Sequence, residues 1–251
     1  DGAGEGYRTF LLRWDGAELT NLTTIRNAFT QAFFSIGTGI GCILAYSAYL
    51  DRDAHLPREA VAVVGMDTAV GLLAGMVTFP VVMSFGLQDV ISGSTLGTIF
   101  IALPTGLASL GSTGKLVALL FFGLAFLAAI TSAVSLLEVP VACLMDRLNW
   151  TRSRAVWVST AVIFVLGLPA ATSLGVLGWM DSVFGGLLLI LGGLLLALLL
   201  GWVVPRRFSD DLEQSSTPPA LRRFLLVLLR WVSPPIVATG LVISVIDLVQ
   251  G

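Results

Sequence analysis

Long apolar stretches separated by short polar segments dominate this chain. A helix needs about 20 apolar residues, at roughly 1.5 Å of rise each, to cross the hydrocarbon core of a bilayer. Six stretches reach that length, and we predict spans at about 24–50, 59–87, 113–145, 153–172, 180–204 and 223–248. The segment 88–111 is also apolar, but glycines and Pro104 interrupt it. Because broken backbone in a membrane needs protein or water around it, we predict a re-entrant extracellular loop there.

The composition agrees with an integral membrane protein. Of the 251 residues, 56% are hydrophobic and 12% are charged, with a mean hydropathy of +0.92, whereas soluble domains carry about 25% charged residues. A net charge of −2 without a basic patch gives no reason to expect nucleic acid. Cys42 and Cys143 both lie in predicted spans and are expected to be packed thiols. His55, the only histidine, lies in a polar loop, so no histidine-based catalytic site and no enzyme is predicted.

The basic residues predict which loops face the cytoplasm. One set of loops contains Arg52, Arg58, Arg147, Arg152, Arg154, Arg206, Arg207, Arg222, Arg223 and Arg230. The opposite set contains Arg8, Arg13, Arg26 and Lys115. The positive-inside rule places the richer set in the cytoplasm. Residues 1–23 are then an extracellular loop and 205–222 a cytoplasmic linker. Since an outside N-terminus beginning at Asp1 has no signal to carry it there, we expect a fragment of a longer protein.

The first predicted span contains FFSIGTGIG, residues 33–41, with glycines at positions 37, 39 and 41. Glycine weakens a helix and tolerates unusual dihedral angles. Two interpretations stand. The glycines could allow close helix packing through small residues. They could instead mark an unwound segment whose freed backbone groups bind an ion or a zwitterionic substrate.

Two acidic residues fall inside predicted spans. Asp67 lies eight residues after Glu59, about 12 Å of helix rise, which is deep for snorkelling to water. An ionisable residue at that depth indicates a functional site, and the alternative is a charge that still reaches the cytoplasmic end. Glu138, in the third span, is predicted to be a hydrogen-bonded buttress for unwound backbone, with a relay role as the alternative.

A third polar feature is a cluster of three neutral oxygens on one face of the third predicted span. Ala128 precedes Thr131 by three residues and Ser132 by four, so both hydroxyls lie beside the carbonyl of residue 128. Such neutral oxygens suit a hard monovalent cation better than a transition metal. The alternative is that the hydroxyls simply donate to carbonyls of their own helix, which is common in membrane helices.

Four motifs together resemble the neurotransmitter:sodium symporter family, in its bacterial amino-acid-transporting branch. They are TQAFFSIGTGIGCILAYSAYL, DTAVGLLAGMVTFP, IFIALP and AAITSAVSLLEVP. The resemblance runs from about residue 2 to 248. It implies an all-α integral membrane protein with the leucine-transporter-type fold. Residues 24–204 would be the five-helix second inverted repeat and 223–248 a further peripheral helix, with the family's spans 1–5 absent.

The resemblance also implies two sodium sites. Ser35 matches the hydroxyl of the first site, and Asp67 stands where that site usually has an Asn. The Ala128 carbonyl, with the hydroxyls of Thr131 and Ser132, matches half of the second site.

Further positions match the substrate pocket and the gate. The pocket positions implied by the resemblance are Phe34, Ser35, Gly37, Ile40, Ser132 and Leu136. Phe34 matches the aromatic lid, and Gly37 and Gly39 match the unwound segment. Asp181 matches the acid of the extracellular gate, whose usual partner is an Arg on the family's first span.

The function implied is sodium-coupled symport of an amino acid across the cytoplasmic membrane by alternating access, with no organic cofactor. Asp67 can supply the negative charge that chloride supplies elsewhere in the family, so chloride is not expected. Gly37 leaves room for a bulky apolar or aromatic amino acid. The alternative is a non-transporting amino-acid sensor or one half of a split membrane assembly. The presence of the coupling residues favours transport, since a sensor need not keep them; they are Ser35, Asp67, Thr131 and Ser132.

Overall fold

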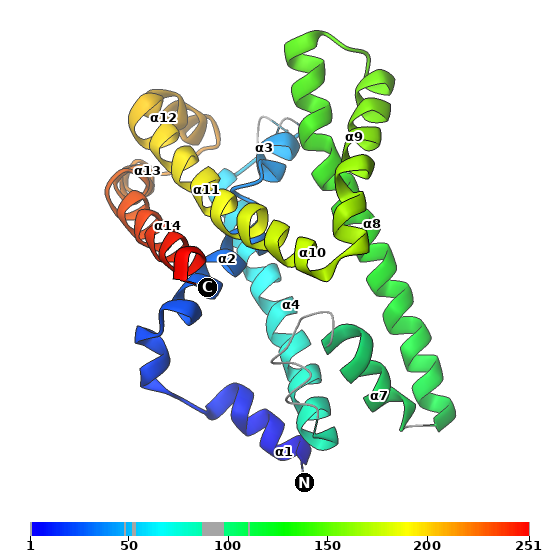
Figure 1. Cartoon of the computed structure of the whole chain (residues 1–251). Helices are drawn as coiled ribbons and strands as arrows, with labels where there is room; N and C mark the ends of the chain where they lie inside the picture. The colour runs from blue at the N-terminus through cyan, green and yellow to red at the C-terminus, as the bar shows by residue number, and fades with distance from the viewer. Residues whose placement is uncertain (1, 48, 52–53, 87–97, 110, 251) are drawn as a thin grey trace. The chain divides into compact units, whose positions relative to one another are not determined.

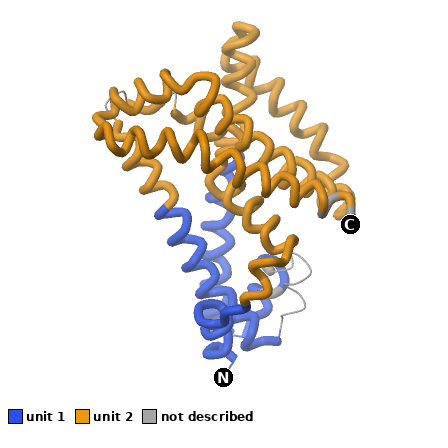
Figure 2. Tube along the Cα trace, turned by 90° about the vertical axis from the view of Figure 1, so that its left-hand side faces the viewer, with its two compact units in different colours: residues 1–15, 65–133 blue, residues 16–64, 134–251 orange. Residues whose placement is uncertain are grey.

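The fold is all-helical over the described part of the chain. It was obtained as a computed structural model that describes residues 2–47, 49–51, 54–86, 98–109 and 111–250, and no strand occurs among them. This confirms the predicted fold class. The helices form two compact units, residues 1–15 with 65–133 and residues 16–64 with 134–251 (Figure 2). Two long helices, α4 (Leu56–Phe85) and α8 (Gly111–Leu148), contribute to both units.

The first unit is built on the second half of α4. Its other elements are α1 (Gly2–Tyr7), a π-helical turn (Arg8–Leu12), a second π-helical turn (Thr98–Ala102), α7 (Leu103–Ala108) and the first part of α8. The rings of Phe10 and Phe79 stack with centroids 4.7 Å apart. A side chain at Gly6 would collide with the backbone of Pro80. These contacts show that α1 and the turn after it lie directly on α4.

The second unit packs around one face of helix α11 (Leu188–Leu198). Its other α-helices, labelled in Figure 1, are α2 (Leu22–Ile36), α3 (Cys42–Ser47), α9 (Arg152–Thr172), α10 (Leu174–Met180), α12 (Pro205–Gln214), α13 (Pro219–Val227) and α14 (Ser233–Gln250). It also contains a 3-10 turn (Gly16–Thr20) and three π-helical turns (Asp181–Leu187, Leu199–Val203 and Leu228–Val232). Ile190 of α11 is fully buried. Helix α11 contacts α2 and α14, and α14 contacts α2. These three helices enclose the core of the unit.

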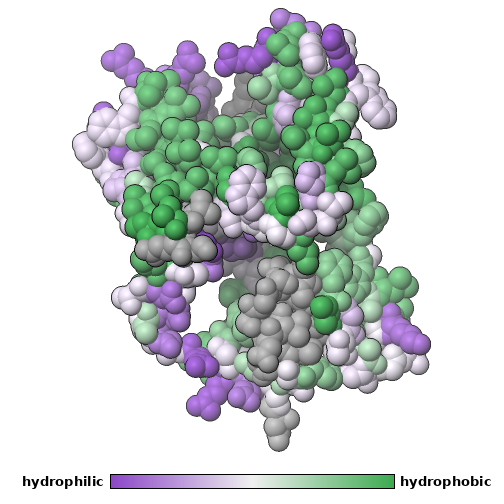
Figure 3. All heavy atoms as spheres, viewed as in Figure 1, coloured by the Kyte–Doolittle hydropathy of each residue, from purple (hydrophilic) through white to green (hydrophobic). Residues whose placement is uncertain are grey.

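Five helices of the described chain are long and apolar enough to cross a membrane. They run over Leu56–Phe85, Gly111–Leu148, Arg152–Thr172, Leu174–Val203 and Pro219–Ile246. Hydrophobic residues cover the exposed flanks of the helices in Figure 3, while hydrophilic residues gather near α12 and at the turn between α8 and α9. Because such an apolar surface would be unfavourable in water, it supports the prediction of a multi-pass membrane protein.

Three predicted segments differ from the structure. The stretch 24–50 is two short helices, α2 and α3, rather than one continuous helix. The segment 205–222, expected as a linker, contains α12, and the last span begins at Pro219. Proline is favoured in the first turn of a helix, and Pro205 and Pro219 start these two helices. Of the predicted re-entrant loop, 88–97 lies outside the described residues, and Thr98–Ala108 is helical.

Candidate functional site

The first feature of the site is a break between α2 and α3. Helix α2 ends at Ile36, α3 begins at Cys42, and the five residues between them form turns. Gly37 has φ 71° and Gly41 has φ 89°. Side chains are strained in this left-handed region, so glycine is the favoured residue at both ends of the break. Four backbone N–H groups at the start of α3 and four carbonyls at the end of α2 lose helical partners at such a break.

The middle glycine has a different role from its neighbours. A Cβ atom at Gly39 would collide with the carbonyl of Leu189 on α11. A Cβ atom at Gly192 would collide in turn with the carbonyl of Gly39. Unwinding and close packing thus both occur, at different positions. Gly37 and Gly41 allow the chain to turn, and Gly39 allows it to pack against α11.

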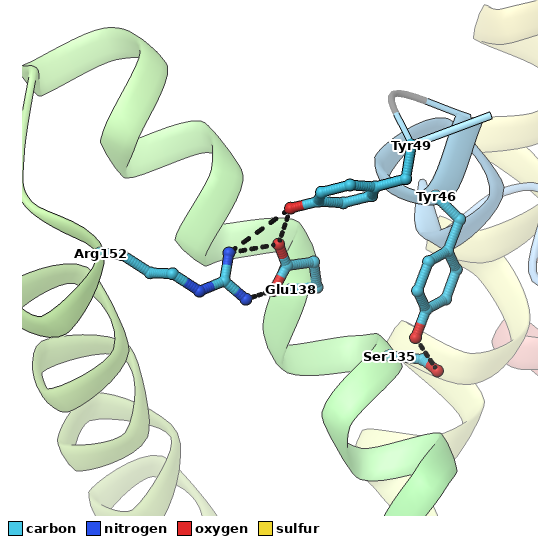
Figure 4. A network of polar contacts seen from close by, with 5 residues as sticks. All are labelled: Tyr46, Tyr49, Ser135, Glu138 and Arg152. Atoms are coloured by element: carbon cyan, nitrogen blue, oxygen red, sulfur yellow. Dashed lines mark hydrogen bonds and ion pairs between the residues drawn. The ribbon is translucent and has the colours of Figure 1, made fainter. Parts of the chain in front are cut away.

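Helix α3 is joined to the second half of α8 by polar contacts. The hydroxyls of Tyr46 and Ser135 lie 2.6 Å apart, and the Cys42 thiol lies 3.8 Å from the Ser135 carbonyl. Tyr49, just after α3, donates from its hydroxyl to Oε1 of Glu138 at 2.8 Å. These contacts hold the short helix that follows the break to one side of α8 (Figure 4).

Glu138 is the centre of this network. Its carboxylate accepts two hydrogen bonds from the guanidinium of Arg152, Nη1 to Oε1 at 2.9 Å and Nη2 to Oε2 at 2.8 Å. The expected buttress of the unwound backbone is therefore wrong, because the carboxylate bonds to Arg152 and Tyr49 instead. Sequence reasoning missed both partners, since Tyr49 and Arg152 belong to other elements and share no local spacing with Glu138.

An open pocket of about 320 Å³ adjoins this network. It is lined by Tyr46, Tyr49, Val134, Glu138 and Arg152. Two tyrosine hydroxyls, a carboxylate and a guanidinium thus meet at one opening, beside the short helix that follows the break. Any displacement of α3 from α8 would have to break these bonds first.

The predicted cation ligands on α8 lie in the first unit. The Thr131 hydroxyl donates to the Ala128 carbonyl at 2.8 Å, which is the helix back-bond foreseen as the alternative. Ala128, Thr131 and Ser132 are all exposed within their unit. The neutral oxygen set therefore fits a sodium ion in type.

Asp181 opens the π-helical turn after α10 and lies in the second unit. It lines a small cavity of about 90 Å³ together with Arg26, Asn27 and Thr30 of α2. Ser182 and Ser244 also line it. The structure thus brings Arg26, which the sequence reasoning did not select, to the same cavity as the predicted gate acid. An arginine at the start of a predicted span was the available signal.

The remaining predicted residues divide between the units. Phe34, Ser35, Ile40 and Leu136 belong to the second unit, where Phe34 is 56% exposed. Asp67, on α4, belongs to the first unit and is partly exposed. Among the described residues, no cluster of three or more His, Cys, Asp or Glu side chains could hold a metal. A transition-metal centre is thus not formed by those residues.

The whole chain fits one family description. The model of the sodium:neurotransmitter symporter family matches residues 1–250. The chain belongs to this family. Its broken helix and the polar residues of α8 are therefore parts of a transporter fold rather than of an enzyme.

Relatives of this symporter-family chain agree with that assignment. It is 38% identical over 181 residues to an uncharacterized sodium-dependent transporter, YhdH, of Bacillus subtilis. The matched segment covers 70% of this chain and 38% of YhdH. It is 28% identical over 223 residues to the sodium-dependent nutrient amino acid transporter 1 of Drosophila grimshawi, covering 85% of this chain and 35% of that protein. The chain thus spans less than half the length of these two relatives.

A solved structure shares the fold. The crystal structure of MhsT in complex with L-phenylalanine matches with a TM-score of 0.87 and 34% identity, over 97% of this chain and 56% of MhsT. The fold of the symporter-family chain is therefore that of part of a leucine-transporter-type protein, as the motifs predict.

Proposed function

We propose that this chain forms the ion- and substrate-binding part of a sodium-coupled amino-acid symporter that works by alternating access. The observation that carries the proposal is the break between Ile36 and Cys42. Helix ends inside a membrane present unpaired carbonyls and amides, which need partners. A sodium ion supplies the partner for carbonyls, and an amino-acid carboxylate supplies the partner for amides.

Two sodium sites are proposed. The second site uses the Ala128 carbonyl and the hydroxyls of Thr131 and Ser132, supported by the proximity of the first two oxygens. The first site uses Ser35 and Asp67. A carboxylate in this site lets chloride be dispensed with, because Asp67 itself balances the charge of the cation.

The proposed substrate pocket is apolar. Its residues are Phe34, Ser35, Gly37, Ile40, Ser132 and Leu136. Gly37 contributes no side chain, which leaves space for a bulky apolar or aromatic amino acid. The related MhsT was solved with L-phenylalanine, and this supports the same substrate class here.

Gates are proposed at both ends of the site. Phe34 and Asp181 would close the outer end, with Arg26 as a cation that lines the same cavity as Asp181. The network of Glu138, Arg152 and Tyr49 would close the inner end, since it holds α3 and α9 to α8. Sodium and substrate bound together share ligands, so each raises the affinity for the other.

The test is uptake of radiolabelled L-phenylalanine by proteoliposomes that contain the complete gene product bearing this sequence. Uptake should need an inward sodium gradient and should stop when choline replaces sodium. Binding of L-phenylalanine that depends on sodium, without any accumulation in the vesicles, would contradict symport and favour a sensor. If none of the twenty amino acids were bound or taken up, amino acids would be ruled out as the substrate class.

A further inference from the structure

The cytoplasmic end of the last span contains a feature that transport does not use. The sequence RWVSPP places Pro234 and Pro235 four and five residues after Arg230. Neither proline has an N–H group, so the Arg230 carbonyl has no donor of its own helix at the α or the π spacing. The indole of Trp202 supplies the missing donor, with Nε1 at 3.1 Å from that carbonyl.

This hydrogen bond sets the position of the Trp202 ring. Trp202 lies in the π-helical turn before α12, and Arg230 lies in the π-helical turn before α14. The two turns meet closely, because a Cβ atom at Gly201 would come within 3.2 Å of the Arg230 backbone. The Arg230 guanidinium stacks over the Trp202 ring at 4.5 Å, and Trp231 meets the same ring edge-on at 5.0 Å.

The stacked guanidinium is exposed and has no acidic partner in the described chain. Arg230 forms no ion pair with any described carboxylate, and the same holds for the exposed Arg206, Arg207 and Arg223. Arg222 differs, because it pairs with Glu213. The nearby acids Asp210 and Asp211 lie on α12 and pair with none of these arginines. One end of the second unit therefore presents several unneutralised cations.

The exposed rings indicate that this end lies at a membrane surface. Trp202 is 45% exposed and Trp231 is 63% exposed, and Trp is enriched where hydrocarbon meets headgroups. A guanidinium held against a ring keeps its outward N–H groups in a fixed fork that matches two phosphate oxygens. Basic residues just cytoplasmic of a span attract anionic lipids.

We propose that Arg230, stacked on Trp202 beside Trp231, binds the phosphate of an anionic phospholipid in the cytoplasmic leaflet. This site goes beyond the proposed transport function and does not depend on it. Trp202 acts by positioning the guanidinium, and Arg206, Arg207 and Arg223 add attraction without a fixed geometry. The lipid tails would lie along the apolar flank of α13 and α14, where Val227 and Ile236 are exposed.

Native mass spectrometry of the detergent-purified gene product, titrated with phosphatidylglycerol or phosphatidylcholine, tests the proposal. Phosphatidylglycerol should be retained in preference to phosphatidylcholine. Arg230→Gln should weaken its binding about fivefold, the contribution expected of one arginine near a charged membrane surface. Arg230→Lys should recover only part of the affinity, because an ammonium ion lacks the fork. Thermal unfolding of each variant without added lipid checks that the fold is kept.

Arg222→Gln is the matched control, since it removes the same charge from an arginine that is already paired. Equal losses for Arg222→Gln and Arg230→Gln would overturn the site in favour of general attraction by net charge. Soluble glycerol 3-phosphate separates the two sources of phosphate. If it displaces the lipid at equal concentration, the ligand is a free phosphate ester and the lipid assignment is overturned.

Discussion

Glu138 and Arg152 form a two-pronged ion pair between residues fourteen apart, across the turn that joins α8 to α9. The pair is unequal, because the Glu138 side chain is 10% exposed and that of Arg152 is 56% exposed. The carboxylate therefore depends on its partners, whereas water can hydrate the guanidinium. Because of this difference in burial, removing Arg152 and removing Glu138 should destabilise the protein by different amounts.

Arg152→Gln should destabilise the protein more than Glu138→Gln. Loss of Arg152 leaves a nearly buried carboxylate that keeps its hydrogen bond from the Tyr49 hydroxyl but has lost its cation, and an unpaired buried charge is costly. We expect the midpoint of thermal unfolding in detergent to fall by about 5 °C for Arg152→Gln and by less than half of that for Glu138→Gln. The double variant should recover part of the loss. A larger effect of Glu138→Gln would contradict the asymmetry.

Two glycines of the break, Gly37 and Gly39, should respond differently to alanine. Gly39→Ala should be the more damaging, because its Cβ meets the carbonyl of Leu189, and overpacking costs about 1–3 kcal/mol or more. Gly37→Ala should cost about 1–2 kcal/mol, because alanine is strained at φ 71°. Unfolding midpoints measured by tryptophan fluorescence rank the variants.

Gly123→Ala is the control for these substitutions. Gly123 lies inside α8 with open space around its Cβ position, so alanine there should be neutral or stabilising by about 1 kcal/mol. If Gly39→Ala were as harmless as Gly123→Ala, the close contact between the break and α11 would not exist.

Trp202→Phe should destabilise the protein by about 1 kcal/mol, because the Arg230 carbonyl loses its one side-chain donor. In the background of Pro234→Ala, residue 234 can donate to that carbonyl through its own N–H group. The cost of Trp202→Phe should then fall close to zero. Unfolding curves of the parent protein, the two single variants and the double variant complete this double-mutant cycle. Equal costs in both backgrounds would show that the indole acts through packing alone.

Thr131→Ala should raise the sodium concentration for half-maximal uptake about tenfold, since one neutral oxygen ligand is lost. Thr131→Ser keeps the hydroxyl and should stay close to the parent protein. Uptake of L-phenylalanine at graded sodium concentrations measures both. An unchanged sodium dependence in Thr131→Ala would rule out the Thr131 hydroxyl as a sodium ligand.

Replacing chloride by gluconate should leave uptake within about twofold of its original rate, because Asp67 balances the charge of the bound cation. Asp67→Asn removes that charge and should make uptake depend on chloride. A large fall in uptake by the parent protein in gluconate would exclude this role of Asp67.

The apolar pattern was sufficient to predict an all-helical membrane protein and the five long helices of the described chain, with boundaries correct to within about six residues. Each such helix satisfies its own backbone hydrogen bonds, so its place in the sequence can be predicted from local hydropathy. The positions of Gly37 and Gly41, with φ in the left-handed region, also follow from residue type. Thr131 and Ala128 lie together because three residues make almost one helical turn.

Only the tertiary structure decided which distant side chains meet. The sequence marks Glu138 as a costly acid in a span. Its partners Tyr49, in the turn after α3, and Arg152, at the start of α9, come from elsewhere in the chain, and packing brings them within hydrogen-bond distance. Gly39 looked the same as its neighbours until α11 was seen to lie against it. The Trp202 indole donates to the Arg230 carbonyl, to which Pro234 and Pro235 cannot donate because neither has an N–H group. Sequence spacing reports neighbours along one helix, whereas contacts between helices depend on how all of them pack together.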